Sequence, residues 1–267
     1  MEIAWFPEGM TWQIVALLAL AALFAGLMDA IIGGGGLLQL PALLLAPGVS
    51  PVQALATNKL ASIFGATAST LTYYRRVKPD LKPMVVIAVI ALVSSMLGAF
   101  TASVLPVEVF RPVIVVVLVV VLLIVVMKPD LGTVRRDGKP LAKQMTVAGV
   151  IGVGIGFYDG VIGPGTGTLL IIALVIFLQQ SFLHASAGAK FVNWATNLGA
   201  LIIFIPLGHV YFGLGALMGL ANMLGAYAGA RLAIAKGSGF IRVFFLVMVG
   251  VLILKLGWDT SYELMNR

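Results

Sequence analysis

The 267-residue sequence contains no cysteine. Disulfide bonds, thiolate metal sites and a cysteine nucleophile are therefore excluded. Its two histidines, His184 and His209, are too few and too far apart for a histidine-rich metal centre. A nucleotide-binding motif of the form G-x-x-x-x-G-K-[ST] is also missing, so we expect neither a metal or other cofactor nor ATP hydrolysis by this chain.

Charge is scarce as well. Only 10% of the residues are charged, 61% are hydrophobic, and the mean hydropathy is +1.10. Soluble domains are roughly a quarter charged, and this chain has too little polar side chain to cover a surface that faces water. The composition therefore predicts an all-α polytopic membrane protein.

The apolar runs have the lengths that a bilayer requires, which is about 20 residues for a helix that crosses it. Valine-rich residues 112–127 would favour a strand by propensity, but a backbone in lipid must satisfy its hydrogen bonds within the segment, which favours a helix. We expect about ten segments, of which the short runs 37–46 and 168–177 are partial. The other eight are 11–28, 50–74, 83–104, 112–127, 144–162, 184–206, 210–230 and 239–256.

The net charge of +7 does not indicate a nucleic-acid partner, because most basic residues lie in short loops between apolar runs. These loops fall on one side of the membrane when the segments alternate, and the positive-inside rule makes that side cytoplasmic. Both termini are then predicted outside. The loop residues are Arg75, Arg76, Lys78 and Lys82, then Lys128, Arg135, Arg136, Lys139 and Lys143, and finally Arg231, Lys236 and Arg242.

The chain repeats itself with an offset of about 130 residues. The run from Gly26 to Gly36 aligns with Gly156 to Gly167, Ala56-Thr-Asn-Lys59 with Ala187-Gly-Ala-Lys190, and Met96-Leu-Gly-Ala with Met223-Leu-Gly-Ala. About five segments per half is an odd number, so the halves would insert in opposite directions, as in secondary transporters with inverted repeats. We therefore predict a first repeat over 1–128, a cytoplasmic linker over 129–143 and a second repeat over 144–267.

Glycines interrupt an apolar stretch at the same place in each half. A broken or re-entrant helix in each repeat would leave backbone N–H groups free, and the positive ends of such helices favour an anion near the middle of the membrane. Alternatively, the glycines only allow close helix packing. The residues predicted to contribute to this site are Gly34, Gly35, Gly36, Gly165, Thr166 and Gly167.

Four charged residues fall inside predicted segments rather than in loops: Asp29, Lys59, Asp159 and Lys190. A charge at the bilayer centre costs at least ~2.5–3.5 kcal/mol, so each needs a partner or a wet cavity. They could form structural ion pairs, either within each half or between the halves. The other interpretation assigns the lysines to an anion site, while the aspartates tune them or carry a coupling proton.

Polar residues accompany both lysines. Asn58 and Ser62 lie near Lys59, and Asn193 and Asn197 follow Lys190 by three and seven residues, which is helical spacing. Their amides and hydroxyl could donate to the oxygens of an anion. They could equally bond to neighbouring helices, which is common in membranes.

These glycine runs, Ala56-Thr-Asn-Lys59 and Ala189-Lys190-Phe-Val-Asn193 together resemble the TauE/SafE family of sulfite exporters and toluene-sulfonate uptake permeases. The resemblance extends over nearly the whole chain. It implies a permease of a bacterial-type inner membrane for sulfite, a sulfonate or a related sulfur anion.

We therefore expect a secondary transporter, not an enzyme, that moves a small anion by alternating access in a lipid bilayer, with a possible coupling proton or counter-ion. An anion channel is the main alternative. An intramembrane aspartyl enzyme is a weaker one, because Asp29 and Asp159 would have to lie close enough to share a proton. The sequence does not determine the oligomeric state.

Overall fold

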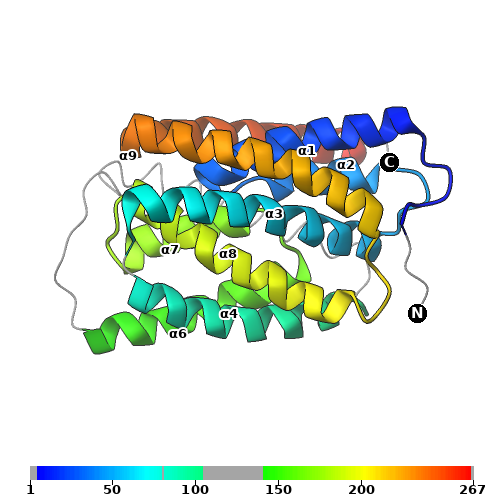
Figure 1. Ribbon diagram of the computed structural model, residues 1–267. Coiled ribbons are helices and arrows are strands. Elements are labelled where there is room, and N and C mark those ends of the chain that lie inside the picture. Colours follow the sequence, from blue (N-terminus) through cyan, green and yellow to red (C-terminus); the bar gives the residue numbers. More distant parts are fainter. Residues whose placement is uncertain (1–4, 80, 105–140, 266–267) are drawn as a thin grey trace.

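The computed structural model describes residues 5–79, 81–104 and 141–265. Within these ranges the chain is helical and contains no strand. The helices lie along a common direction in one bundle (Figure 1). Their bounds are α1 Trp12–Ile32, α2 Gly36–Leu44, α3 Pro51–Val77, α4 Leu81–Ala102, α6 Leu141–Val161, α7 Thr166–Phe177, α8 Phe182–Phe204 and α9 Phe212–Met265.

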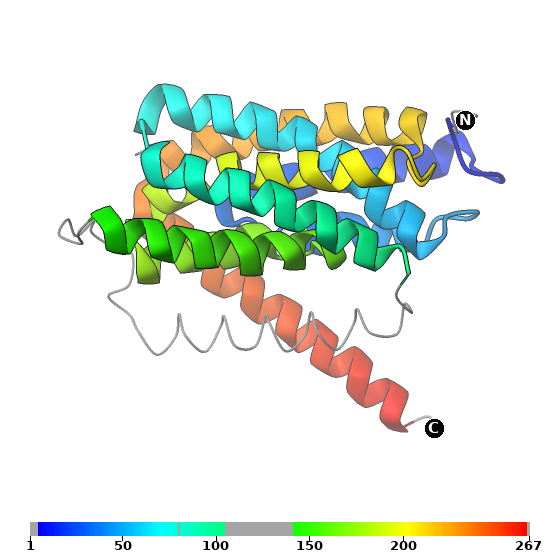
Figure 2. The same ribbon diagram turned by 90° about the horizontal axis from the view of Figure 1, so that it is seen from below.

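Nine of the ten predicted segments coincide with helix in the described residues. The tenth, 112–127, and the predicted linker up to residue 140 lie outside them. α9 contains two of the nine, because its backbone is kinked at Gly237, where φ is 75°. The part after this kink runs obliquely to the other helices (Figure 2).

Three of the helices are long and apolar enough to cross a membrane: 12–32, 82–102 and 212–244. Their outward faces carry large apolar side chains such as Phe24 on α1 and Val93 on α4, each more than half exposed. Large apolar side chains are favourable in contact with lipid and unfavourable in contact with water. The described residues therefore agree with a membrane protein.

Helix packing exchanges partners between the two halves. α1 packs mainly against α9 and α6 against α4, while α3 packs against α9 and α8 against α4. The central pair, α3 and α8, contains one helix of each half. Both hydrophobic cores accordingly mix residues of the two halves, as Leu18 and Met218 do in one core and Ile31 and Val192 in the other.

Local sequence explains where the two central helices begin. α3 starts with a capping box in which the Ser50 hydroxyl accepts from the Gln53 N–H and the Gln53 side chain accepts from the Ser50 N–H. α8 starts at Ser181, whose hydroxyl accepts from the His184 N–H. Lys59 and Lys190 each follow their capping serine by nine residues. The two lysines therefore lie at corresponding positions along their helices.

Candidate anion site

The two predicted helix breaks are present. α1 ends at Ile32 and α2 begins at Gly36, while α6 ends at Val161 and α7 begins at Thr166. Gly33, Gly163 and Gly165 have φ of 78°, 81° and 83°. This left-handed conformation favours glycine, which explains why the interruptions are glycine-rich.

The breaks also touch each other. Thr168, in the first turn of α7, donates its N–H to the Gly33 carbonyl (3.2 Å) and its hydroxyl to the Ile32 carbonyl (2.9 Å). A Cβ on Gly33 would lie 2.0 Å from the carbonyl carbon of Gly167. Because the two backbones approach so closely, neither glycine has room for a side chain.

The four charged residues form two ion pairs, and both pairs join the halves. Lys59 Nζ lies 2.7 Å from Asp159 Oδ2, and Lys190 Nζ lies 2.7 Å from Asp29 Oδ2. Of the pairings that the sequence left open, the structure therefore has the one between halves. Each lysine lies beside the helix break of the opposite half, as a Cβ on Gly163 would be 3.1 Å from Lys59 Nζ.

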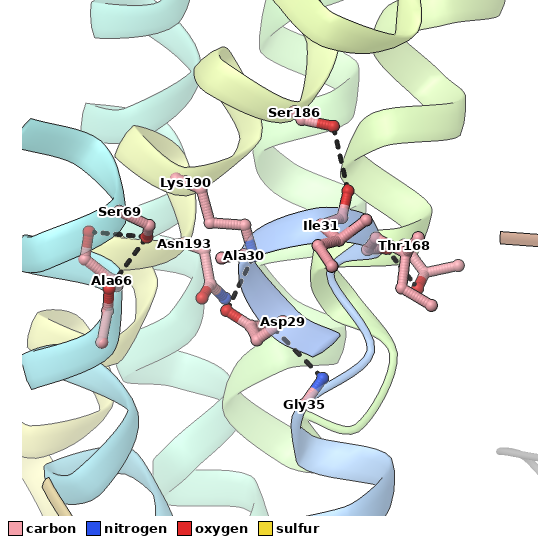
Figure 3. Close-up of polar contacts among 12 residues, drawn as sticks. Asp29, Ala30, Ile31, Gly35, Ala66, Ser69, Thr168, Ser186, Lys190 and Asn193 are labelled. Carbon is pink, nitrogen blue, oxygen red and sulfur yellow. Dashed lines mark hydrogen bonds and ion pairs between the residues drawn. The ribbon is translucent and has the colours of Figure 1, made fainter. Parts of the chain in front are cut away.

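Asp29 is held by two donors. Figure 3 shows its carboxylate between Lys190 and Gly35, whose N–H donates to Asp29 Oδ1 (3.4 Å). The carboxylate thus lies at the positive N-terminal end of α2. Nearby, the Ser186 hydroxyl donates to the Ile31 carbonyl at the end of α1 (3.3 Å).

A small cavity lies where the breaks and the central helices meet. Its volume is about 20 Å³, which is room for roughly one water molecule. An oxyanion therefore cannot enter until the surrounding groups move apart. The lining residues are Asp29, Gly33, Gly36, Asn58, Lys59, Ser62, Asp159, Gly163, Gly165, Gly167, Asn193 and Asn197.

Most of the predicted site residues thus share one cavity. Lys190, Gly34, Gly35 and Thr166 are not among its lining residues. The Thr166 hydroxyl donates to the Gly163 carbonyl (2.7 Å), so it closes its own turn. Lys190 is fully buried against Asp29.

Sequence reasoning left Gly33 and Gly163 out of the site, although both line the cavity. Each is the first glycine of its interruption, and this position could have identified it. A helix that is followed by a residue in the left-handed conformation usually has glycine there. Thr168 was missed too. Its role depends on contact between the halves, which no local pattern reveals.

The asparagines of the two halves differ in their hydrogen bonds. Asn197 Nδ2 donates to the Asn193 carbonyl (2.8 Å) and lies 3.3 Å from Asn193 Oδ1. Asn58 is 4% exposed, and its Oδ1 has no hydrogen-bond partner among the described residues. A buried polar atom without a partner is costly, so this atom is available to a ligand.

Comparison with known proteins agrees with this architecture. The family described as Sulfite exporter TauE/SafE matches residues 18–256. The chain belongs to the TauE/SafE family.

Its relatives are named as transporters, not enzymes. A probable membrane transporter protein, ORF9, of a Sinorhizobium species is 36% identical over 96% of this chain and 97% of its own length. The probable membrane transporter protein YfcA of Escherichia coli K12 is 34% identical over 92% and 91%, and one of Haemophilus influenzae is 30% identical over 94% and 97%. No solved structure matches. This TauE/SafE chain is thus a membrane transporter.

Proposed function

We propose that this protein is a secondary transporter that carries a small oxyanion across a bacterial-type inner membrane by alternating access. The family description names a sulfite exporter, which favours sulfite, a sulfonate or a related sulfur anion as the substrate. The substrate would bind in the cavity between the two helix breaks. The ammonium of Lys59, which lines this cavity, is the main support for an anion.

The observation that carries the proposal is the position of a buried lysine beside each break. Lys59 lines the cavity, and Gly36 and Gly167, at the starts of α2 and α7, line it as well. The N–H groups of Gly36 and Gly167 have no hydrogen-bond partner among the described residues, so they can donate to an anion together with the Lys59 ammonium. The Asn58 side chain also lines the cavity, and its Nδ2 can donate to the anion.

Alternating access is supported by the packing of the two halves. Exchanging the halves turns the α1–α9 contact into α6–α4 and the α3–α9 contact into α8–α4. In an inverted repeat, each half can adopt the conformation of the other, which moves the opening to the other side of the same site. The closed cavity would then be a state between the two open ones.

The lysine assignment is tested by uptake of sulfite, sulfate, thiosulfate and small sulfonates into proteoliposomes. Lys59→Met is expected to reduce uptake about 10- to 100-fold, because a hydrogen bond to a charged group contributes ~1.5–3 kcal/mol. Lys236→Met, which removes an exposed lysine of α9, is the matched control and should transport normally. Normal uptake by a Lys59→Met, Lys190→Met double variant would refute the site.

The same liposomes distinguish a transporter from an anion channel. A transporter with one closed site accelerates exchange when unlabelled anion is present on the opposite side. A channel shows no such acceleration and conducts far more ions per second. Accelerated exchange is the expected result, since the described cavity has room for roughly one water molecule.

A further inference from the structure

We propose that the Lys59–Asp159 pair opens for the anion, and that Asp159 takes up a proton as Lys59 changes partner. Each anion is then carried together with one proton. This inference rests on the proposed transport of an anion through the cavity, and it adds the coupling ion and the residue that carries it.

The two ion pairs differ in their access to the cavity. Lys59 and Asp159 both line it, whereas only Asp29 of the other pair does. An anion that enters can therefore reach the ammonium of Lys59 but not that of Lys190.

The two aspartates also differ in how firmly they are held. Asp29 accepts from Lys190 and from the Gly35 N–H, so it binds one of the backbone N–H groups at the start of α2. Apart from the contact with Lys59, no hydrogen bond to Asp159 Oδ2 is found in the part of the chain that the structure describes. When its lysine leaves, Asp159 Oδ2 therefore keeps no donor among the described residues, whereas Asp29 would keep the Gly35 N–H.

Asn58 marks the Lys59 side as the binding side. It precedes Lys59 on α3 and lines the cavity, where its Nδ2 can donate to an anion. The second half has Ala189 at the corresponding place before Lys190. Among the described residues, the Lys59 side therefore combines an ammonium that lines the cavity with an amide donor directly before it.

The charge balance of the cavity requires a proton. The two lysines and two aspartates sum to zero, and the cavity lining contains no further charged side chain among the described residues. When an anion takes over Lys59, Asp159 is left as an unpaired buried carboxylate. Such a group neutralises itself rather than stay charged in a medium of low polarity.

Among the described helices packed against α6, no side chain supplies this proton in place of the solution. Helices α4, α7 and α8 pack against α6. The one titratable side chain of α4 is Lys82, in its first turn, and α7 has none. Helix α8 carries His184 and Lys190, and Lys190 is paired with Asp29. On α6 itself, Tyr158 donates its hydroxyl to the Pro164 carbonyl (2.8 Å). Lys59 stays an ammonium throughout. A proton from one side binds the Asp159 carboxylate, and it leaves on the other side when the anion departs and the pair re-forms.

The experiment counts protons and labelled anions that enter the same proteoliposomes, with the membrane potential held at zero. Wild type is expected to move about one proton for each thiosulfate or sulfonate, since neither anion titrates near neutral pH. Asp159→Asn should lower the number of protons moved per anion by about one at any fixed pH. The same difference is expected with sulfite, because the proton that sulfite itself carries is the same for wild type and variant at one pH. Asp29→Asn should leave the ratio unchanged.

The outcomes are separable. If wild type takes up none of the anions, the proposed function and this inference both fail. If it takes up an anion but moves clearly less than half a proton with a non-titrating one, only the inference fails. The inference also fails if Asp29→Asn, not Asp159→Asn, lowers the ratio. Should Asp159→Asn not fold, the wild-type proton count decides alone.

Discussion

At the scale of single residues, the two buried lysines show how like positions acquire unlike chemistry. Each follows a capping serine by nine residues and lies 2.7 Å from an aspartate of the other half. Their neighbours differ, since Asn58 stands before Lys59 and Ala189 before Lys190. The Lys190–Asp29 pair, of which only Asp29 lines the cavity, is therefore suited to a structural role.

Removing one member of that pair should destabilise the protein. Lys190→Met leaves the Asp29 carboxylate without its charged partner, and breaking a buried pair in this way costs about 3–5 kcal/mol. The double variant Lys190→Met, Asp29→Asn removes both charges and should recover much of the loss. Unfolding of the purified variants in detergent measures the free energy of unfolding of each. If the double variant loses as much stability as the two single variants together, the ion pair does not couple the two residues.

The sequence predicted these charges but not their partners. Asp29, Lys59, Asp159 and Lys190 stand out because each falls inside an apolar run. Spacing alone could not choose between pairs within a half and pairs between halves, since both place a lysine near an aspartate. That choice depends on which helices pack at the centre, and this is a property of the whole fold.

At the scale of helices, the breaks are defined by backbone conformation and by contact with each other. Glycine runs made the breaks predictable, because a left-handed residue after a helix is usually glycine. Their mutual contact through Thr168 was not predictable, and neither was the buried amide pair of Gln39 on α2 and Asn222 on α9 (2.7 Å). Both depend on packing between distant segments.

Two adjacent glycines should respond differently to alanine. Gly33→Ala puts a Cβ into the backbone of Gly167 at a φ of 78°, which should cost well over the ~1–3 kcal/mol of the strained backbone alone. Gly34→Ala meets only the side chains of Ile32 and Leu37, at 3.5 Å or more, and should be tolerated.

Membrane yield and thermal unfolding in detergent measure the difference between these glycine variants. Equal behaviour of the two would show that the breaks do not touch as described.

At the scale of the whole molecule, the bundle has two unlike ends. The junction of α3 and α4, the start of α6 and the kink of α9 lie at one end, and the start of α1 and the junction of α8 and α9 lie at the other (Figure 1). The first end carries Arg75, Arg76, Lys78 and Lys236. The positive-inside rule predicts that this end faces the cytoplasm.

The absence of cysteine makes this orientation easy to test. Arg76→Cys, in the last turn of α3 at its predicted cytoplasmic end, should react with a membrane-impermeant maleimide only in opened cells. Leu207→Cys, between α8 and α9, is 46% exposed as leucine and should react in intact cells. The wild-type chain has no thiol and gives the background. The reverse pattern would invert the predicted orientation.

The exchange of packing partners has a consequence for biosynthesis. Of the described helices, α1 emerges first from the ribosome, and the helix that it packs against most extensively, α9, is translated last. The first helix must therefore wait in the lipid until nearly all of the chain has been inserted. A polypeptide that stops after its first half would lack the surfaces that α1, α3 and α4 are shaped to meet, so quality control can recognise an unfinished copy by its unmatched helices.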